Sequence, residues 1–238
     1  MNKINIKAII WGILSFVCVS VIVVVMLDIV KYSQDENKVA SLTNSDRIGV
    51  NTEENNQDIV KFSETHLYIE DTNIDYDVVQ GTDNEYYLTH TPDGKYNKAG
   101  WIFFDYRVTE ESKNKIIYGH NRVTGSMLGS LTKLTSVSYF DKNGLDVIHL
   151  MENNKDTIYR VYTVFVTDIN FDYLHCNFED DEKFMKYIKS MKSKNTVSLL
   201  KDVEVTSTDD ILTLSTCAGE DRLVVQAVKL RVDDNFEC

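Results

Sequence analysis

The chain has 238 residues, of which 43% are hydrophobic, a size that suits one domain of about 150–200 residues with an additional segment. Its formal net charge is −12, and its 25 Lys and Arg residues are scattered along the sequence. Because phosphate binding requires clustered basic side chains, this composition argues against nucleic acid as a partner and predicts an acidic, solvated surface.

An apolar, uncharged run covers residues 8–27, and Lys3 and Lys7 precede it. About 20 such residues are needed to cross the hydrocarbon core of a bilayer. We therefore expect a cytoplasmic tail at 1–7 and a transmembrane anchor at 8–27, with the remainder of the chain outside the cell because the lysines come first. A cleaved signal peptide is the alternative, but the run is long for one and leads into Asp28 without a small-x-small cleavage site.

The segment 28–57 is polar and lacks sustained periodicity, so we expect a tether with a helical turn or two continuing from the membrane. In the remaining domain, 58–238, short runs of β-branched and aliphatic residues alternate with turns. The predicted strands are 66–70, 74–80, 100–105, 115–119, 145–151, 157–168, 211–217 and 222–230. Many short strands with few helices predict a mainly β fold, a barrel or sandwich, with peripheral helices.

Two helices are expected between these strands. The first, 126–134, has Ser126 as its N-cap and places Leu131 and Leu134 on one face. The second, 180–194, has acidic residues at its start and lysines at its end, which suits the helix dipole. Its apolar stripe consists of Phe184, Tyr187, Ile188 and Met191.

The final predicted hairpin brings a thiol near a guanidinium. Cys217 is the last residue of the strand 211–217, and Arg222 opens the return strand. A nearby permanent cation favours the thiolate, and guanidinium N–H groups can hold a developing oxyanion. The pattern predicts a nucleophilic cysteine, although a small buried Cys in a hairpin is the commoner arrangement.

A histidine occupies a comparable position in an earlier strand. The apolar strand 115–119 ends at a Gly-His-Asn corner that contains His120. A histidine at a strand end, before a polar loop, is better placed for a cleft than for the core, and a surface His in a turn is the alternative. With Cys217 and Arg222, His120 completes a candidate set of acid, nucleophile and oxyanion donor.

Several motifs occur together with these residues, namely Tyr118-Gly119-His120-Asn121, Thr213-Leu214-Ser215-Thr216-Cys217, the downstream Arg222, Thr82-Asp83-Asn84-Glu85-Tyr86-Tyr87-Leu88, Gly100-Trp101-Ile102-Phe103-Phe104-Asp105-Tyr106-Arg107 and Gly125-Ser126-Met127-Leu128-Gly129. Over about residues 59–232 the chain thereby resembles the sortases, cysteine transpeptidases of Gram-positive cell surfaces, and class B most of all. The resemblance narrows the fold to a sortase-like eight-stranded β-barrel. It also implies a helical segment at the start of the soluble domain, for which 58–63 is the candidate.

The resemblance implies a role for each candidate residue. Cys217 attacks the Thr carbonyl of a sorting motif near the C-terminus of a secreted protein, His120 protonates the departing amine, and Arg222 supplies charge to the oxyanion. An amine of peptidoglycan or its precursor then resolves the acyl-enzyme. No cofactor and no metal are implied.

Residues beside the candidate trio have both a functional and a structural interpretation. Thr216 and Ser215 can contact a peptide through their hydroxyls, or satisfy the backbone at a strand end. Asn121 and Tyr118 can orient His120 or line the groove, or serve the turn and the packing. Glu220 and Asp221 form either a solvated acidic turn or an anchor for Arg222 or His120.

The remaining cysteines point away from a disulfide framework. Cys18 lies in the apolar run and Cys238 is the last residue, so Cys176 is the only plausible partner for Cys217. A nucleophile must be reduced, which makes Cys176 a bystander. His175 and Cys176 are adjacent without a second ligand pair at zinc-binding spacing, so we expect no metal site.

Two other functional classes are considered. A cell-wall cysteine peptidase would use water in place of the amine, but in papain-like enzymes the Cys precedes the His, whereas His120 comes before Cys217 here. A non-catalytic surface module would keep the fold for binding alone, and the joint presence of Cys, His and Arg argues against it.

Overall fold

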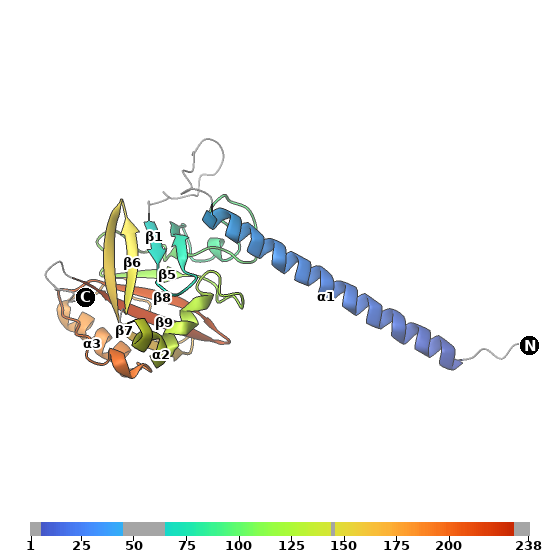
Figure 1. Ribbon diagram of the computed structural model, residues 1–238. Helices are drawn as coiled ribbons and strands as arrows, with labels where there is room; N and C mark the ends of the chain where they lie inside the picture. The colour runs from blue at the N-terminus through green and yellow to red at the C-terminus, as the bar shows by residue number, and fades with distance from the viewer. Residues whose placement is uncertain (1–5, 45–64, 144–145, 231–238) are drawn as a thin grey trace, which may run out of the picture. The chain divides into compact units, whose positions relative to one another are not determined.

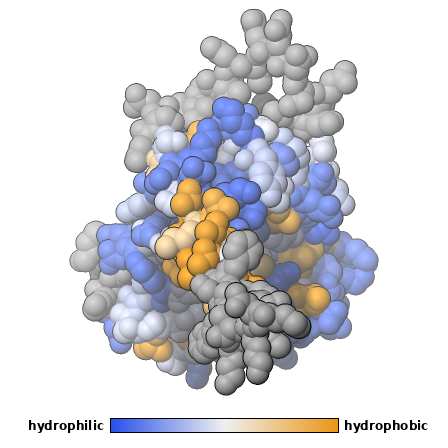
Figure 2. All heavy atoms as spheres, turned by 90° about the vertical axis from the view of Figure 1, so that its right-hand side faces the viewer, coloured by the Kyte–Doolittle hydropathy of each residue, from blue (hydrophilic) through white to orange (hydrophobic). Residues whose placement is uncertain are grey.

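The computed structural model describes residues 6–44, 65–143 and 146–230, in two compact units, 1–42 and 43–238 (Figure 1). The described part of the first unit belongs to one helix, α1 (Ile6–Asn44), whose last two residues fall in the second unit. From Val17 to Val30 its apolar side chains are 50–61% exposed. Within the described ranges it is the one helix long and apolar enough to cross a membrane, over Val17–Leu42. Figure 2 shows apolar residues in orange gathered in one part of a view in which most other coloured residues are hydrophilic.

Helix α1 corrects the predicted tether in part. The helix continues to Asn44, so 28–44 is helical over more than the turn or two that the sequence predicted. The rest of the predicted tether and the candidate helical segment at 58–63 lie outside the described residues.

In its described residues, the second unit is built on one sheet of nine strand segments with helices at its periphery (Figure 1). In spatial order these are β2 (Asp75–Asp77), β1 (Thr65–Tyr68), β6 (Val147–Glu152), β7 (Lys155–Thr167), β9 (Asp221–Lys229), β8 (Ile211–Ala218), β5 (Asn114–Tyr118), β4 (Phe103–Phe104) and β3 (Val79–Gln80). The mainly β fold predicted from the sequence is confirmed. The predicted strand at 100–105 is shorter, since only β4 is paired there.

The two edges of this sheet are consecutive in the chain. Strands β2 and β3 are separated by Val78 alone. The Val78 amide donates to the carbonyl of Thr65, the first residue of β1, at 2.8 Å, and the Val79 amide donates to the Ile102 carbonyl, just before β4, at 3.3 Å. One extended run, 75–80, therefore bridges both ends of the sheet and nearly closes it into a barrel. Counted as a single strand, it leaves the predicted total of eight.

Strands β9 and β8 lie in the middle of the sheet. All six residues from Ile211 to Thr216 are buried, as are the six from Leu223 to Val228, so both faces of each strand are covered. Strands covered on both faces read as continuous apolar runs, which is why this hairpin was evident in the sequence.

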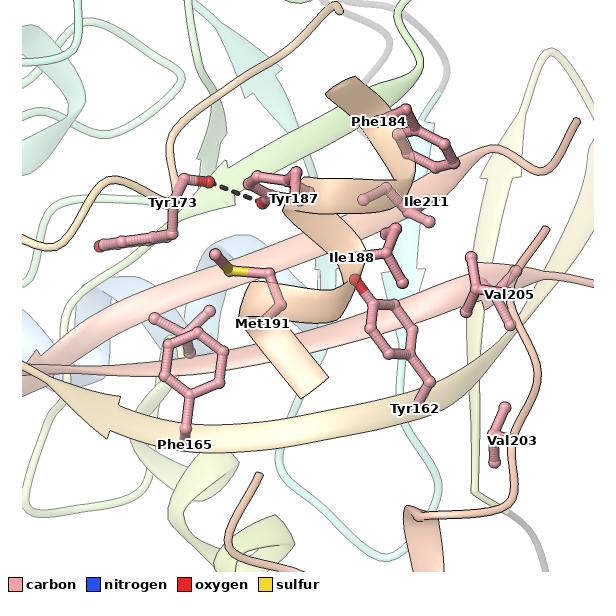
Figure 3. Packing of buried hydrophobic residues seen from close by; sticks show 12 residues of the cluster. Tyr162, Phe165, Tyr173, Phe184, Tyr187, Ile188, Met191, Val203, Val205 and Ile211 are labelled. Atoms are coloured by element: carbon pink, nitrogen blue, oxygen red, sulfur yellow. Dashed lines mark hydrogen bonds between the residues drawn. The ribbon is translucent and has the colours of Figure 1, made fainter. Parts of the chain in front are cut away.

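Helix α3 (Asp181–Ser193) packs on the outside of these strands, and the Tyr187 hydroxyl donates to the Tyr173 carbonyl at 2.7 Å (Figure 3). The Asp180 side chain caps it by accepting a hydrogen bond from the Lys183 amide. The predicted apolar stripe is confirmed, because all four of its members are buried: Phe184, Tyr187, Ile188 and Met191. They join a cluster with residues of β7, β8 and β9.

The helix predicted at 126–134 is wrong in its start and its type. A 3₁₀ helix, η2 (Gly129–Thr135), occupies its second half, and Leu128 precedes it without a side-chain cap. Gly125 and Met127 have φ angles of 83° and 53°, so a turn interrupts the helical path around Ser126. Three short helices were not predicted, namely η1 (Tyr86–Leu88), α2 (Val137–Asn143) and η3 (Ser198–Leu200).

The closing run of the barrel carries two carboxylates that bind a histidine of β1 between them. His66 on β1 contacts Asp77 through Nδ1 at 2.8 Å and Asp75 through Nε2 at 2.5 Å. The hydrogen bond with Asp77 raises the pKa of His66 above 6.5 against the effect of burial, and Asp75 raises it further. A raised histidine pKa means that the folded state binds the proton more tightly than the unfolded chain does.

We therefore expect the His66 contribution to the free energy of unfolding to be complete below pH 6.5 and to be lost as the pH rises through the folded-state pKa. The contribution is at most about 1 kcal/mol, because the carboxylates are partly exposed. Urea unfolding of the full chain in detergent, with wild type compared with His66→Gln across this pH range, measures it. The stability difference should shrink on the alkaline side. If the pH dependence persisted after Asp75→Asn and Asp77→Asn were combined, the assignment would be wrong.

Candidate active site

Parallel pairing of β5 with β8 brings two distant strand ends to one edge of the barrel. Tyr118 is paired with Ser215 at the end of β5. His120 and Cys217 each follow two residues later, so the same register places them at one level. Parallel strands end at the same edge of a sheet, and this geometry brings together the histidine and the thiol that the sequence selected.

Two hydrogen bonds extend this pairing beyond the strands. The Thr216 hydroxyl donates to the Gly119 carbonyl at 2.7 Å, and the side-chain Nδ2 of Asn121 donates to the Cys217 carbonyl at 2.6 Å. Gly119 is required by close packing, because a Cβ there would lie 2.8 Å from side-chain atoms of both Ile102 and Leu128. The segment before His120 is thereby fixed against the segment that carries the thiol.

The thiol of Cys217 is free and exposed. Arg222 lies directly opposite Cys217 in the antiparallel β8–β9 pair, and the turn between these strands is only Gly219 and Glu220. Gly219 has a φ of 67°, a backbone conformation that favours glycine. The tight turn therefore returns a guanidinium to the level of the thiol.

His120 is half-buried, and its orientation is set by a backbone acceptor. Its Nε2 lies 2.7 Å from the Leu88 carbonyl oxygen, at the end of η1. A carbonyl can only accept, so Nε2 carries the proton and Nδ1 is the ring nitrogen left to exchange one. This contact could not be predicted from the sequence, because a backbone carbonyl is independent of residue type.

A tyrosine from the loop between β7 and α3 completes the surroundings of the thiol. The Tyr173 hydroxyl and Ser215 Oγ are 2.8 Å apart, and Ser215 stands two residues before Cys217 on the same face of β8. Burial raises the pKa of Tyr173, and the hydrogen bond with Ser215 and the charge of Arg222 oppose that rise. Tyr173 was not predicted from the sequence as a site residue, although it lies three residues before Cys176.

A sortase domain matches residues 67–230 of this chain. The chain belongs to the sortase family. Sortase B of Listeria monocytogenes is 39% identical over 171 residues, which cover 67% of this chain and 66% of that protein. Sortase B of Staphylococcus aureus is 29% identical over 166 residues, which cover 68% of this chain and 64% of that protein. The aligned part thus spans just under two thirds of either relative.

A solved Staphylococcus aureus sortase B–substrate complex is similar to this chain with a TM-score of 0.66 and 27% identity, over 74% of this chain and 82% of that one. Together these similarities place the chain in class B. The resemblance stated from its motifs is confirmed, and so is the sortase barrel.

In this sortase the flanking candidates divide into two groups. Ser215, Thr216 and Asn121 all lie at the thiol end of β8 and make the contacts described above. Tyr118 is directed elsewhere, since its hydroxyl donates to Asp105 Oδ2 at 2.8 Å. In the acidic turn, the backbone carbonyl of Asp221 accepts a hydrogen bond from Arg222 Nη1 at 3.0 Å.

Cys176 is a free, buried thiol in the loop that joins β7 to α3. Burial raises the pKa of Cys176 to about 11, and the negative charge of Asp105 contributes. Its backbone carbonyl accepts a hydrogen bond from the Asn114 amide at 2.9 Å. Within the described residues, no group of three or more His, Cys, Asp or Glu side chains could hold a metal ion.

The two thiols should differ sharply in reactivity. We expect iodoacetamide to alkylate Cys217 at least about tenfold faster than Cys176, because only an accessible thiolate reacts. Peptide mapping by mass spectrometry of the full chain in detergent, quenched at intervals, gives both rates in one experiment. Denatured protein, in which both thiols are accessible, is the control. Equal rates in the folded protein would contradict the assigned burial.

Proposed function

We propose that this sortase is a cysteine transpeptidase in which Cys217 is the nucleophile, His120 the general acid and base, and Arg222 the oxyanion donor. The observation that carries the proposal is the exposed, free thiol of Cys217 opposite Arg222, at the end of the strand whose parallel partner β5 leads directly to His120. A nucleophile, a proton carrier and a permanent cation at one edge of a barrel are the components that acyl transfer through a thioester requires.

The first half-reaction forms the acyl-enzyme. The Cys217 thiolate adds to the scissile carbonyl carbon, and the carbonyl oxygen becomes an oxyanion that the Arg222 guanidinium stabilises. Protonated His120 then gives a proton to the departing amine as the C–N bond breaks. Since the Leu88 carbonyl retains a proton on Nε2, the proton transferred comes from Nδ1.

The second half-reaction reverses the direction of the proton. An incoming amine attacks the thioester carbonyl, and neutral His120 accepts the amine proton at Nδ1. A second oxyanion forms beside Arg222 and collapses, the C–S bond breaks, and Cys217 leaves as a thiolate. A new amide is formed, so the overall reaction exchanges one amide for another and consumes no cofactor.

The acyl donor in this proposal is the sorting-motif peptide of a secreted surface protein, and the acceptor is an amine of peptidoglycan or its precursor. Support for a peptide donor comes from the related Staphylococcus aureus enzyme, whose solved structure is a substrate complex. Ser215 and Thr216 are the hydroxyl-bearing residues next to Cys217 that we propose contact this peptide, together with Asn121. Water in place of the amine would make the enzyme a peptidase.

We further propose that α1 is a single-pass anchor with the N-terminus in the cytoplasm and the catalytic domain outside the cell. Its exposed apolar side chains between Val17 and Val30 would be unfavourable in water and suit a bilayer. Lys3 and Lys7 precede the apolar stretch and favour retention of that end in the cytoplasm.

The orientation is testable by protease treatment of intact cells. We expect added protease to release the 65–230 domain while a tag placed at the N-terminus stays protected. Permeabilised cells, in which the tag is also digested, are the control. A released protein whose natural N-terminus lies near Asp28 would show instead that a signal peptide had been cleaved.

The catalytic roles are testable with sorting peptides, in the presence and absence of an amine, by mass spectrometry of the acyl-enzyme and of the products. Cys217→Ala should abolish turnover, and Cys176→Ala is the matched control that should retain it. Arg222→Lys keeps the charge but loses the planar fork, so turnover should fall on the order of a hundredfold to a thousandfold.

Substrates with different leaving groups separate His120 from Arg222. His120→Ala should fail with a peptide but still acylate Cys217 with an activated ester, which needs no protonation of its leaving group. Arg222→Ala should be slow with both, because both pass through the oxyanion. Rescue of Arg222→Ala but not of His120→Ala by the ester would reverse the two roles. Product that forms equally without amine would favour the peptidase, and no acylation at all would favour a binding module.

A further inference from the structure

A buried carboxylate lies behind the candidate active site and is not part of the proposed chemistry. Asp105 follows β4 and is fully buried. Its Oδ1 accepts hydrogen bonds from the Arg107 backbone amide and Nε, both at 2.9 Å. Its Oδ2 accepts from Arg107 Nη2 and Tyr118 at 2.8 Å and from Asn84 at 3.0 Å. Desolvation would raise the pKa of Asp105, but the hydrogen bonds, led by that of Arg107, lower it to about 2, so the carboxylate is charged at working pH.

Arg107 has a second partner far away in the chain. Its Nη2 also donates to the Leu174 carbonyl at 3.2 Å, in the loop 168–180 that joins β7 to α3. Leu174 follows Tyr173, whose hydroxyl meets Ser215 near the thiol. The bidentate pair with Asp105 fixes the guanidinium, and the fixed guanidinium holds the loop backbone next to the tyrosine.

The loop also packs on α3, because the Phe178 ring centroid lies 5.0 Å from that of Phe184 and 4.9 Å from that of Tyr187. An open pocket of about 590 Å³ lies beside this contact and is lined by loop residues, including Phe171 and Phe178, and by residues of α3. On the barrel side, Asn114 holds the far part of the loop through the His175 and Cys176 carbonyls. Nearer the thiol, two side chains donate hydrogen bonds to carbonyls of the loop: Arg107 to that of Leu174, and Tyr187 to that of Tyr173.

The same carboxylate also reaches the strand that carries the histidine. Tyr118, which donates to Asp105, stands two residues before His120, just as Ser215 stands two residues before Cys217. Asp105 thus connects, through Tyr118 on one side and Arg107 on the other, the two segments whose ends form the candidate site.

We propose that Asp105 and Arg107 are positioning residues that hold Tyr173, and through it Ser215, in place beside Cys217. The proposal rests on the transpeptidase function proposed above. Neither residue touches the reacting atoms; their effect on turnover passes through Tyr173. A lysine cannot replace Arg107, because a single ammonium lacks the planar fork that binds both carboxylate oxygens and a carbonyl.

The test uses Arg107→Lys in the full chain in detergent. This variant keeps a positive charge beside buried Asp105, so the fold is preserved better than with a neutral residue. We expect kcat/KM for the sorting peptide to fall about tenfold, the size expected for loss of one hydrogen bond from a charged donor. The matched control is Arg160→Lys, since Arg160 forms a 3.0 Å pair with Asp146 and is exposed to a similar degree (47% against 43%). Its kcat/KM should be unchanged.

A double-variant cycle separates positioning from general loosening of the fold. If Arg107 acts through Tyr173, then Arg107→Lys should cost little further activity once Tyr173→Phe has removed the hydroxyl. A purely structural role would give additive losses in the two variants. Additive losses, or full activity of Arg107→Lys, would overturn the proposal.

Amide hydrogen exchange supplies a readout that does not depend on activity. Exchange at residues 173–177 should be faster in Arg107→Lys than in wild type and in Arg160→Lys. Unchanged exchange there sinks the proposal whatever the kinetics show. If Arg107→Lys does not fold, Asp105→Asn combined with Arg107→Gln, which leaves no unpaired charge, replaces it. Failure of the transpeptidase function is recognised separately, because wild type would then form no Cys217-dependent product of transfer to the amine, while the exchange result still stands.

Discussion

The parallel pairing of β5 with β8 is the constraint on which the rest of the molecule depends. These strands come from segments about a hundred residues apart, and neither end has any chemistry alone. The pairing of β5 with β8 sets the position of His120 along the strand direction relative to Cys217. The short turn between β8 and β9 then places Arg222 opposite Cys217. A slip of one residue in either register would turn the thiol or the guanidinium to the opposite face of the sheet.

That pairing is held by polar groups buried between the barrel and α3. Thr213 on β8 donates to Asn114 on β5 at 2.8 Å and accepts from Gln226 on β9 at 2.9 Å. Gln226 also donates to the Tyr187 hydroxyl at 2.6 Å and accepts from Tyr162 at 2.7 Å. A buried polar network rigidifies a core only when all its donors and acceptors are paired. If β5, β8 and β9 were paired in another register, several donors of this network would have no acceptor. The network therefore specifies one register where apolar packing alone would tolerate others.

The sequence predicted the parts of this design that depend on side-chain periodicity. Burial repeats with the period of a helix or strand. For this reason the sequence could predict the strands of the central hairpin, the apolar stripe of α3, and the positions of Cys217 and His120 at strand ends. Contacts made by backbone carbonyls could not be predicted from the sequence. The carbonyls of Leu88 and Leu174 carry no residue signature, and their partners, His120 and Arg107, lie 32 and 67 residues away. The helix predicted at 126–134 failed for a related reason, since Met127 has a left-handed backbone and its amide donates to the Tyr76 hydroxyl, 51 residues away.

Near closure of the barrel has a consequence for how any peptide can be recognised. Extended peptides often bind by adding a strand to an exposed sheet edge, where main-chain groups are unpaired. In the described part of this domain the sheet ends in segments of three and two residues that belong to one continuous run. Such short, mutually adjacent borders offer almost no row of free amides and carbonyls. Selectivity for an acyl donor must therefore reside in loops and side chains, which can diverge between relatives while the barrel beneath them stays the same.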